Sequence, residues 1–419
     1  MPFNPFNEKP IKLEKCYEDW KRLYLKPYNK YEVDPYTRVR IILAAGAEFE
    51  ATWFSHQFQR HCPDNAVRRV LAGIRRSEQM QQKRLASLKP INETLLETTI
   101  GYEQVAVDLT ANLAQMETDN YIKAALDFAL LEDFDHLYRF SDLLEMEHGV
   151  LSENLVGGYT EIMPGRPTIS EHRFPFDDVK RHVPSAASSL QSKLNTGIIT
   201  AAEQQTMNYY MNVGQFYASD LGRKLFSEIA LIEEQHVTHY GSLLDTDSTW
   251  LESLLLHEYT ECYLYYSLML DETDDYVKKV WETHLNQEIS HLHLAKKLLN
   301  NYESKDYNAV VGNGDFPSPL AFNRNAERNR EYVRNILKNT VTNTAVLEDY
   351  AKVKDLPDNY AFFKYNKGLN GSLKDVASHK VIDNYIAEFG EDYRFETKNH
   401  PIKELRDRKK DNTAIGRDK

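Results

Sequence analysis

A single offset of 155 residues relates two sets of acidic and imidazole side chains in this 419-residue chain. In the second set, Glu203 and Glu258 each precede an acid-x-x-His pair by 30 residues. Those pairs are Glu233-x-x-His236 and Glu288-x-x-His291. Subtracting the offset gives the first set, which is Glu48, Glu78, Gln81, Glu103, Asp133 and His136. We interpret this regularity as an internal duplication.

The 30-residue spacing predicts pairs of helices that bring these side chains level. Thirty residues form two helical arms of roughly 20 Å and a turn, so a carboxylate in one helix faces the acid-x-x-His pair of the next. Positions i and i+3 share a helix face, so each pair offers an oxygen and a nitrogen ligand in one direction. Apolar residues at helical spacing flank Glu258 and Glu288, which places these acids in core seams.

The same periodicity predicts an all-α fold, because few stretches alternate with a period of two. Pro, Asp and Asn clusters break both 38–148 and 197–300 into four helices. We therefore expect two tandem four-helix bundles. The predicted segments are an N-terminal extension (1–37), bundle 1 (38–148), an irregular Gly- and Pro-containing crossover (149–196), bundle 2 (197–300) and a C-terminal extension (301–419) with helices near 322–351 and 380–389.

Composition limits the partners of the chain. A net charge of -12 disfavours nucleic-acid binding, which requires a basic surface. No apolar run has the length of a membrane span or of a secretory signal. The three cysteines form no CxxC pair, as expected in a reducing compartment. We expect a cytoplasmic protein without nucleic-acid or membrane partners, and a homodimer stays open.

Acids in a core seam require a positive counter-charge, because each carboxylate buried without a cation costs several kcal/mol. For bundle 2 we expect two metal ions, and an oxygen-rich site with a few imidazoles suits iron or manganese. Bundle 1 differs, since Gln81 replaces an imidazole and Arg75 stands one turn before Glu78. Two alternatives are open for bundle 1: a metal-free site neutralised by Arg75, and an altered metal site.

The second set of residues resembles the ferritin-like superfamily, and specifically the rubrerythrin type of dimetal bundle. The resemblance covers 197–300 and, in degraded form, 38–148. It implies that Glu233 and Glu288 bridge two iron ions. The other ligands that it implies, each bound to one ion, are Glu203, Glu258, His236 and His291.

The resemblance also gives roles to three further residues. Glu261 follows Glu258 by one turn and matches an extra glutamate, implied to exchange with a histidine as the metals change oxidation state. Tyr210 and Tyr265 lie seven residues after Glu203 and Glu258, where the family has tyrosines beside the ligands, although plain core packing is an equal alternative for both. The rubredoxin module of rubrerythrins is absent, so electrons have to come from an external donor or from the substrate.

The leading hypothesis is a non-haem dimetal oxidoreductase that reacts with dioxygen or peroxide, of peroxidase or oxygenase type. An organic molecule near the site is the second compatible substrate. The competing hypothesis is a non-enzymatic helical scaffold in which salt bridges replace metal in both bundles. An iron-storage cage is disfavoured, because a tandem bundle with a tail of over a hundred residues fits poorly into a symmetric shell.

Overall fold

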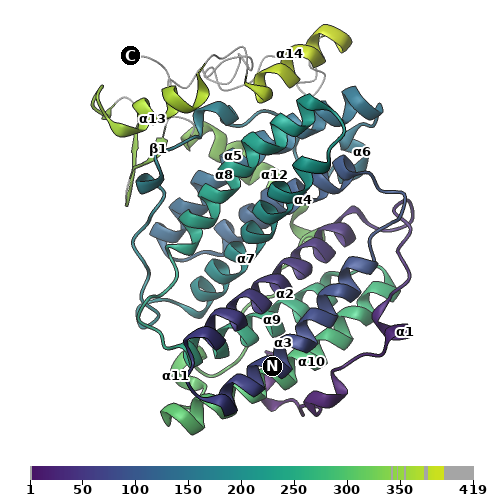
Figure 1. Ribbon diagram of the computed structural model, residues 1–419, viewed down its shortest axis with the longest axis vertical. Coiled ribbons are helices and arrows are strands. Elements are labelled where there is room, and N and C mark those ends of the chain that lie inside the picture. The colour runs from purple at the N-terminus through teal and green to yellow at the C-terminus, as the bar shows by residue number, and fades with distance from the viewer. Residues whose placement is uncertain (1, 341–342, 347, 353–354, 372–375, 391–419) are drawn as a thin grey trace. The chain divides into compact units, whose positions relative to one another are not determined.

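The computed structural model describes the chain except for residues 1, 341–342, 347, 353–354, 372–375 and 391–419. The described chain is mostly helical (Figure 1), which confirms the all-α prediction. Its eight long helices are α2 (Pro35–His61), α3 (Asn65–Ser87), α4 (Leu95–Met116), α5 (Asn120–His148), α7 (Leu190–Val213), α8 (Asp220–Gly241), α9 (Trp250–Asp271) and α10 (Asp275–Glu303). The predicted breaks between these helices are confirmed.

Shorter elements occupy the ends and the crossover. They are η1 (Pro5–Asn7), η2 (Leu13–Lys15), α1 (Trp20–Leu23), α6 (Ser152–Val156), η3 (Thr168–Ser170), η4 (Pro175–Asp177), η5 (Gly214–Phe216), α11 (Asn308–Val311), η6 (Asn323–Asn325), α12 (Ala326–Thr340), α13 (Ala361–Asn370) and α14 (Ala377–Phe389). Antiparallel strands β1 (Asn343–Val346) and β2 (Asp349–Lys352) form a hairpin. The predicted helix near 322–351 is therefore too long, because its C-terminal part is this hairpin. The predicted helix near 380–389 is confirmed as part of α14.

The duplication extends to the residues that begin the helices. Thr94 and Glu97 form a capping box at the start of α4, and Thr249 and Glu252 form the same box at the start of α9, 155 residues later. Asp119 and Asp274, also 155 apart, cap α5 and α10 by accepting backbone N–H bonds. Local capping chemistry thus sets the same helix boundaries in both repeats.

The helices form two compact units that do not follow the two halves of the sequence. Unit 1 contains residues 1–93, 183–202 and 244–323, and unit 2 contains 94–182, 203–243 and 324–419. Each unit therefore combines two helices of one repeat with two of the other, which corrects the predicted bundles 38–148 and 197–300. The reason is physical: equivalent helices of the two repeats have equivalent apolar faces, so spacing alone cannot tell which pairs meet.

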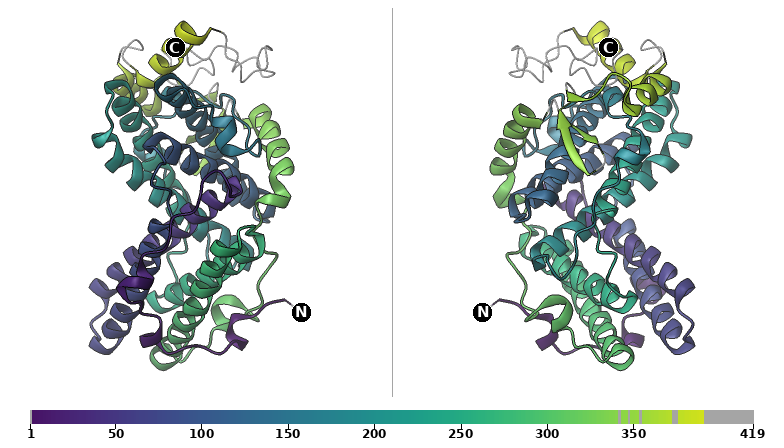
Figure 2. Two further views of the ribbon diagram at one scale, coloured as in Figure 1. Left: turned by 90° about the vertical axis from the view of Figure 1, so that its right-hand side faces the viewer. Right: turned by 90° about the vertical axis from the view of Figure 1, so that its left-hand side faces the viewer.

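Unit 1 is built on α2, α3, α9 and α10, which run side by side in Figures 1 and 2. The predicted seam residues Leu255, Cys262 and Tyr265 of α9 are fully buried. A buried ion pair ties α2 to the end of α9, because Arg40 Nη2 lies 2.7 Å from Asp271 Oδ2. The Arg40 side chain is fully buried and the Asp271 side chain is 8% exposed, so this largely buried pair helps to set how the two helices meet.

Unit 2 is built on α4, α5, α8 and the part of α7 from Glu203 onward. Its core includes apolar residues of α12 and α14, such as Leu337 and Ile382, so the C-terminal extension covers this unit. The crossover also packs into it. Thr168 donates its backbone N–H to Asp135 Oδ2 of α5 at 2.8 Å, and Arg166 and Arg173 are fully buried. The crossover segment around these residues is part of the core of unit 2.

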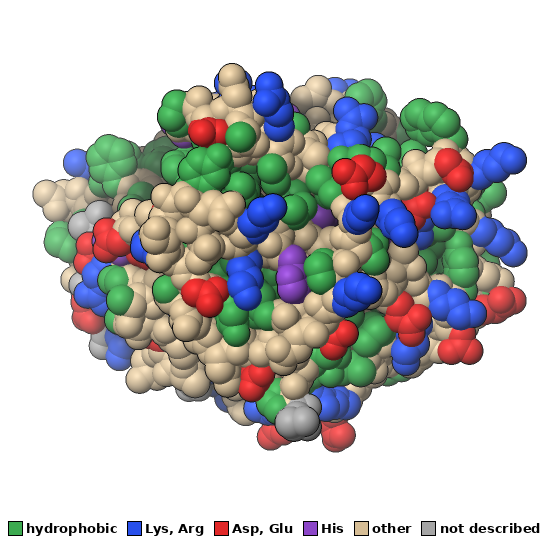
Figure 3. Space-filling model, turned by 90° about the horizontal axis from the view of Figure 1, so that it is seen from below, with side chains coloured by type: hydrophobic (Ala, Val, Ile, Leu, Met, Phe, Trp, Pro, Cys, Tyr) green, Lys and Arg blue, Asp and Glu red, His purple; other side chains and the backbone are tan. Residues whose placement is uncertain are grey.

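On the face that Figure 3 shows, Lys and Arg are interspersed among Asp and Glu, with hydrophobic side chains between them. None of the described helices combines the length and the hydrophobicity that crossing a bilayer requires.

Gly165 tests the packing of the crossover against α5. A Cβ at this position would lie 2.2 Å from the Leu131 carbonyl oxygen and 2.9 Å from the Asp135 nitrogen. We expect Gly165→Ala to destabilise the protein by about 1–3 kcal/mol, measured by urea denaturation, because backbone cannot move aside cheaply. Gly241→Ala, which meets no atom within 4 Å, is the matched control. Equal midpoints for the two variants would contradict this packing.

Candidate metal centres

The predicted acids and imidazoles converge in two clusters, but each cluster combines residues of both repeats. The unit-2 cluster consists of Glu103, Asp133, His136, Glu203, Glu233 and His236. The unit-1 cluster consists of Glu48, Glu78, Gln81, Glu258, Glu261, Glu288 and His291. Every member is at most 2% exposed. The predicted six-residue site of 197–300 is therefore wrong as a set, because its α7 and α8 ligands lie in unit 2 and its α9 and α10 ligands lie in unit 1.

Helix geometry presents the unit-2 ligands inward. Glu103 lies on α4 and Glu203 on α7, each as a single carboxylate in mid-helix. α5 presents Asp133 with His136 and α8 presents Glu233 with His236, each as an i, i+3 pair on one face. Asp133 and His136 were expected to belong to an altered site, but they complete a set of four carboxylates and two imidazoles.

The two imidazoles of unit 2 both point a nitrogen at the carboxylates. His236 Nδ1 lies 3.1 Å from Asp133 Oδ1 and 3.6 Å from Glu203 Oε2. His136 Nδ1 lies 2.9 Å from Glu233 Oε1. Ligand atoms of Asp133, Glu203, Glu233 and His236 lie within 4.8 Å of one another, and so do those of Glu103, His136 and Glu233. Glu233 is common to both groups, so it lies between two positions that can each hold a cation.

The charges of unit 2 are not balanced by hydrogen bonds alone. Neither oxygen of Glu203 accepts a hydrogen bond within the described part of the chain. Burial, together with the charge of Asp133, raises the pKa of Glu203 well above its ordinary value. Burial also acts on Glu233, but bonds from His136 and His236 outweigh it and lower the pKa of this carboxyl to about 2. The cluster is thus a site that attracts positive charge.

Glu132 and Arg173 complete the unit-2 site and were missed from the sequence. His236 Nε2 lies 2.5 Å from Glu132 Oε2, so the other ring nitrogen is turned toward the cluster. Arg173 forms an ion pair with Glu132 and lies 2.7 Å from Asp178. Although burial opposes it, the Arg173 cation holds the pKa of Glu132 well below its usual range. Arg173 lies in the irregular crossover, where no periodic pattern could reveal it.

The unit-1 cluster has the same plan with different residues. His291 Nδ1 lies 3.0 Å from Glu288 Oε2 and 3.8 Å from Glu258 Oε2. Gln81 donates its amide N–H to Glu288. Ligand atoms of Glu78, Glu258 and His291 form one close group, and those of Glu258, Glu261 and Glu288 form another. Glu258 is common to both groups, whereas the resemblance implied Glu288 as the bridging residue.

The carboxylates of unit 1 also lack partners. Both oxygens of Glu258 and of Glu261 are without a hydrogen-bond donor among the described residues. Burial, and then the charge of Glu288, raises the pKa of Glu261 well above its ordinary value. Arg75 donates to Ser55 Oγ at 3.2 Å and to Gln59 Oε1 at 2.6 Å. Its guanidinium is therefore directed at neutral groups, although its charge still contributes to the pKa of Glu78.

Both predicted tyrosines lie beside the clusters. Tyr210 donates its hydroxyl to Glu103, and Tyr265 donates its hydroxyl to Glu48. In each case the accepting glutamate belongs to the other repeat, across the unit from the tyrosine's own helix. His284 Nδ1 lies 3.1 Å from the Tyr265 hydroxyl. The two hydroxyls orient cluster carboxylates, so core packing is not their only role.

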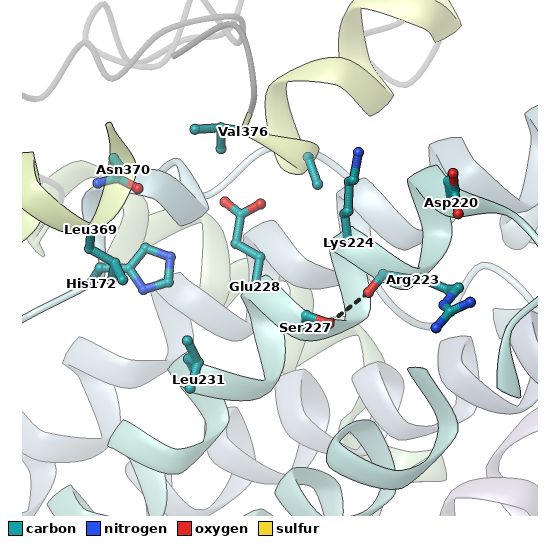
Figure 4. A pocket seen from close by; sticks show the side chains of 11 residues that line it. His172, Asp220, Arg223, Lys224, Ser227, Glu228, Leu231, Leu369, Asn370 and Val376 are labelled. Atoms are coloured by element: carbon teal, nitrogen blue, oxygen red, sulfur yellow. Dashed lines mark hydrogen bonds between the residues drawn. The ribbon is translucent and has the colours of Figure 1, made fainter. Parts of the chain in front are cut away.

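A pocket of about 720 Å³ opens in unit 2 between α8, the crossover and the C-terminal elements (Figure 4). Leu231 and Leu369 form an apolar part of its wall. The His172 ring faces the space between these two leucines and Glu228. Burial, then the nearby His136 and Arg173 charges, lowers the pKa of His172 to about 4. His172 therefore lies near the unit-2 cluster as well as in the pocket wall, and it precedes Arg173 in the chain.

Comparison of this chain with protein-family models, with curated proteins and with solved structures gave no match. The functional argument therefore rests on the two clusters.

Glu78 gives a pH-dependence test of the metal-free protein. Burial raises its pKa from 4.5 to about 8, so its contribution to stability is full below about pH 4.5 and is lost as the pH rises toward 8. We expect the free energy of unfolding, measured with urea and a chelator, to fall between pH 5 and 8. The fall is smaller by about 1–3 kcal/mol in Glu78→Gln. The exposed Glu282→Gln should leave the profile unchanged, and an unchanged profile in Glu78→Gln would refute the raised pKa.

Proposed function

We propose that the unit-2 cluster holds two iron or manganese ions and that the protein is a non-haem dimetal oxidoreductase acting on peroxide or dioxygen. The observation that carries the proposal is the convergence of four buried carboxylates and two imidazoles from four helices. This combination of oxygen and nitrogen ligands suits iron and manganese.

Charge supports two divalent ions. Glu103, Asp133, Glu203 and Glu233 contribute four negative charges, which two divalent cations neutralise. Glu132 needs no metal, because Arg173 already pairs with it. Without cations, four carboxylates held at 1% exposure or less would cost several kcal/mol each or take up protons. The donor set therefore fits a metal pair in both number and charge.

The residues have separable roles in this proposal. Asp133, Glu203, Glu233 and His236 would hold one ion, and Glu103, His136 and Glu233 would hold the other. A bound metal pair would supply redox chemistry toward peroxide or dioxygen. The protein would exclude water and hold each carboxylate in place, and the Tyr210 hydroxyl would orient Glu103 by donating a hydrogen bond to it. Electrons would come from an external donor or an organic substrate, for which the pocket beside His172 offers room.

The scaffold alternative is favoured by one observation, which is the buried Arg173 network. That network shows that this core tolerates salt bridges. Its guanidinium, however, pairs with Glu132, Glu171 and Asp178 rather than with a ligand of the cluster. The six cluster residues therefore keep their need for cations, and metal content decides between the two functions.

Removing both imidazoles of unit 2 tests the proposal. We expect His136→Ala with His236→Ala to lose about two iron or manganese ions per chain, measured by elemental analysis of protein purified without added metal. Loss of the optical change that follows peroxide addition should accompany it. His379→Ala, which removes another buried histidine of unit 2, is the control. A wild-type protein that carries no metal would support the scaffold.

Glu132 tests the orientation of His236. We expect Glu132→Gln to weaken metal binding by about 10–100-fold, measured by competition with a chelator, because His236 loses its charged partner. Glu234→Gln is the matched control, since this residue neighbours Glu233 but is exposed. Circular dichroism checks that both variants remain helical. Equal affinities in the two variants would remove Glu132 from the site.

A further inference from the structure

Between the two clusters, three positions that the 155-residue offset makes equivalent carry side chains of a different chemical class. His236 of unit 2 corresponds to Gln81 of unit 1. Glu132, which binds His236, corresponds to Gln287. Ala106 corresponds to Glu261. Unit 1 thus has amides where unit 2 has the histidine and its carboxylate partner, and it has a carboxylate where unit 2 has alanine.

The contacts show that these replacements alter the donors of unit 1. Gln81 uses its amide N–H on Glu288, and its Oε1 is buried without a donor among the described residues. Gln287 turns its amide N–H to the Cys16 carbonyl at 2.9 Å, so it does not orient a ligand as Glu132 does. Glu261 is 2% exposed and both of its oxygens lack a described donor. Gln81 and Glu261 thus both contribute buried oxygen atoms that no described group hydrogen-bonds.

The donor sets are therefore different in kind. Unit 1 offers five carboxylates, an amide oxygen and a single imidazole, His291. Unit 2 offers four carboxylates and two imidazoles. Carboxylate and carbonyl oxygens suit hard cations such as Mn²⁺, whereas imidazole favours iron and the later transition metals. Any given site binds Fe²⁺ more tightly than Mn²⁺, so the informative quantity is the ratio of the two metals at each site.

We infer that unit 1 is a second metal centre, and that it selects Mn²⁺ over Fe²⁺ more strongly than unit 2 does. The inference rests on the proposed function only in taking the unit-2 metal pair as its reference. It assigns this chain two non-equivalent centres, an oxygen-rich one in unit 1 and a mixed oxygen and nitrogen one in unit 2.

Anomalous X-ray scattering measures the two sites separately in the intact protein. Metal-free protein is incubated without oxygen in equal concentrations of Mn²⁺ and Fe²⁺, crystallised, and measured at both absorption edges. We expect the Mn:Fe occupancy ratio to be about tenfold higher in unit 1 than in unit 2, the scale of effect that a ligand's supporting partner has on metal affinity. Both centres belong to one molecule, so each is the control for the other.

Reciprocal substitutions test which residues set the ratio. Gln81→His with Gln287→Glu should lower the unit-1 ratio to that of unit 2. His236→Gln with Glu132→Gln should raise the unit-2 ratio while leaving unit 1 unchanged. Where a double variant fails to fold, Glu261→Ala is the milder substitute, because Ala106 already stands at the equivalent position of unit 2.

The outcomes separate this inference from the proposed function. Equal ratios at the two wild-type sites overturn the inference and leave the dimetal proposal intact. Metal in unit 2 with none in unit 1 also overturns the inference and leaves the dimetal proposal intact. Absence of metal from both sites overturns both. A higher ratio in unit 1 that Gln81→His with Gln287→Glu abolishes supports the inference in full.

Discussion

The burial of carboxylates inside helical bundles is the constraint on which the rest of this structure depends. Each unit places at least four acids at 2% exposure or less, many with oxygens that no described group hydrogen-bonds. Such charges are costly in a low-dielectric interior unless cations or protons balance them. In unit 2, Arg173 neutralises Glu132, whereas no described Lys or Arg forms an ion pair with the ligands of the adjacent cluster. The acids of each cluster therefore make its interior a place that attracts positive charge.

Sequence spacing predicted the helices and nearly all the cluster residues, but not how they assemble. The 30-residue intervals relate helices that are consecutive along the chain. The capping residues Thr94 and Thr249 set where α4 and α9 begin. The choice of partner is a long-range property. Because α4 with α5 resembles α9 with α10, either pair fits α2 with α3 equally well in a periodicity argument. Only the three-dimensional contacts show that each unit combines helices of both repeats instead of containing one repeat.

The supporting residues were beyond sequence reasoning for a different reason. Glu132 is the neighbour of a predicted ligand, yet adjacent positions on a helix face different directions and carry no periodic signal. Arg173 lies in the irregular crossover, outside both repeats, and contacts Glu132 of α5 and Gln235 of α8. Tyr210 and Tyr265 were predicted from their spacing, but their acceptors, Glu103 and Glu48, lie across the unit. The sequence predicts which residues share one face of a helix, whereas contacts between distant segments become known only from the three-dimensional structure.

The exchange of halves has a chemical consequence. Each unit contains helices of both repeats. A substitution at one position therefore changes one cluster, while the equivalent position of the other repeat belongs to the other cluster. Gln81 alters only unit 1, and the equivalent His236 serves only unit 2. Gln81 and Gln287, however, come from different repeats, and both lie in unit 1. Where unit 2 has an imidazole bonded to a carboxylate, unit 1 has two amide side chains, so the difference in donors follows the unit rather than the repeat.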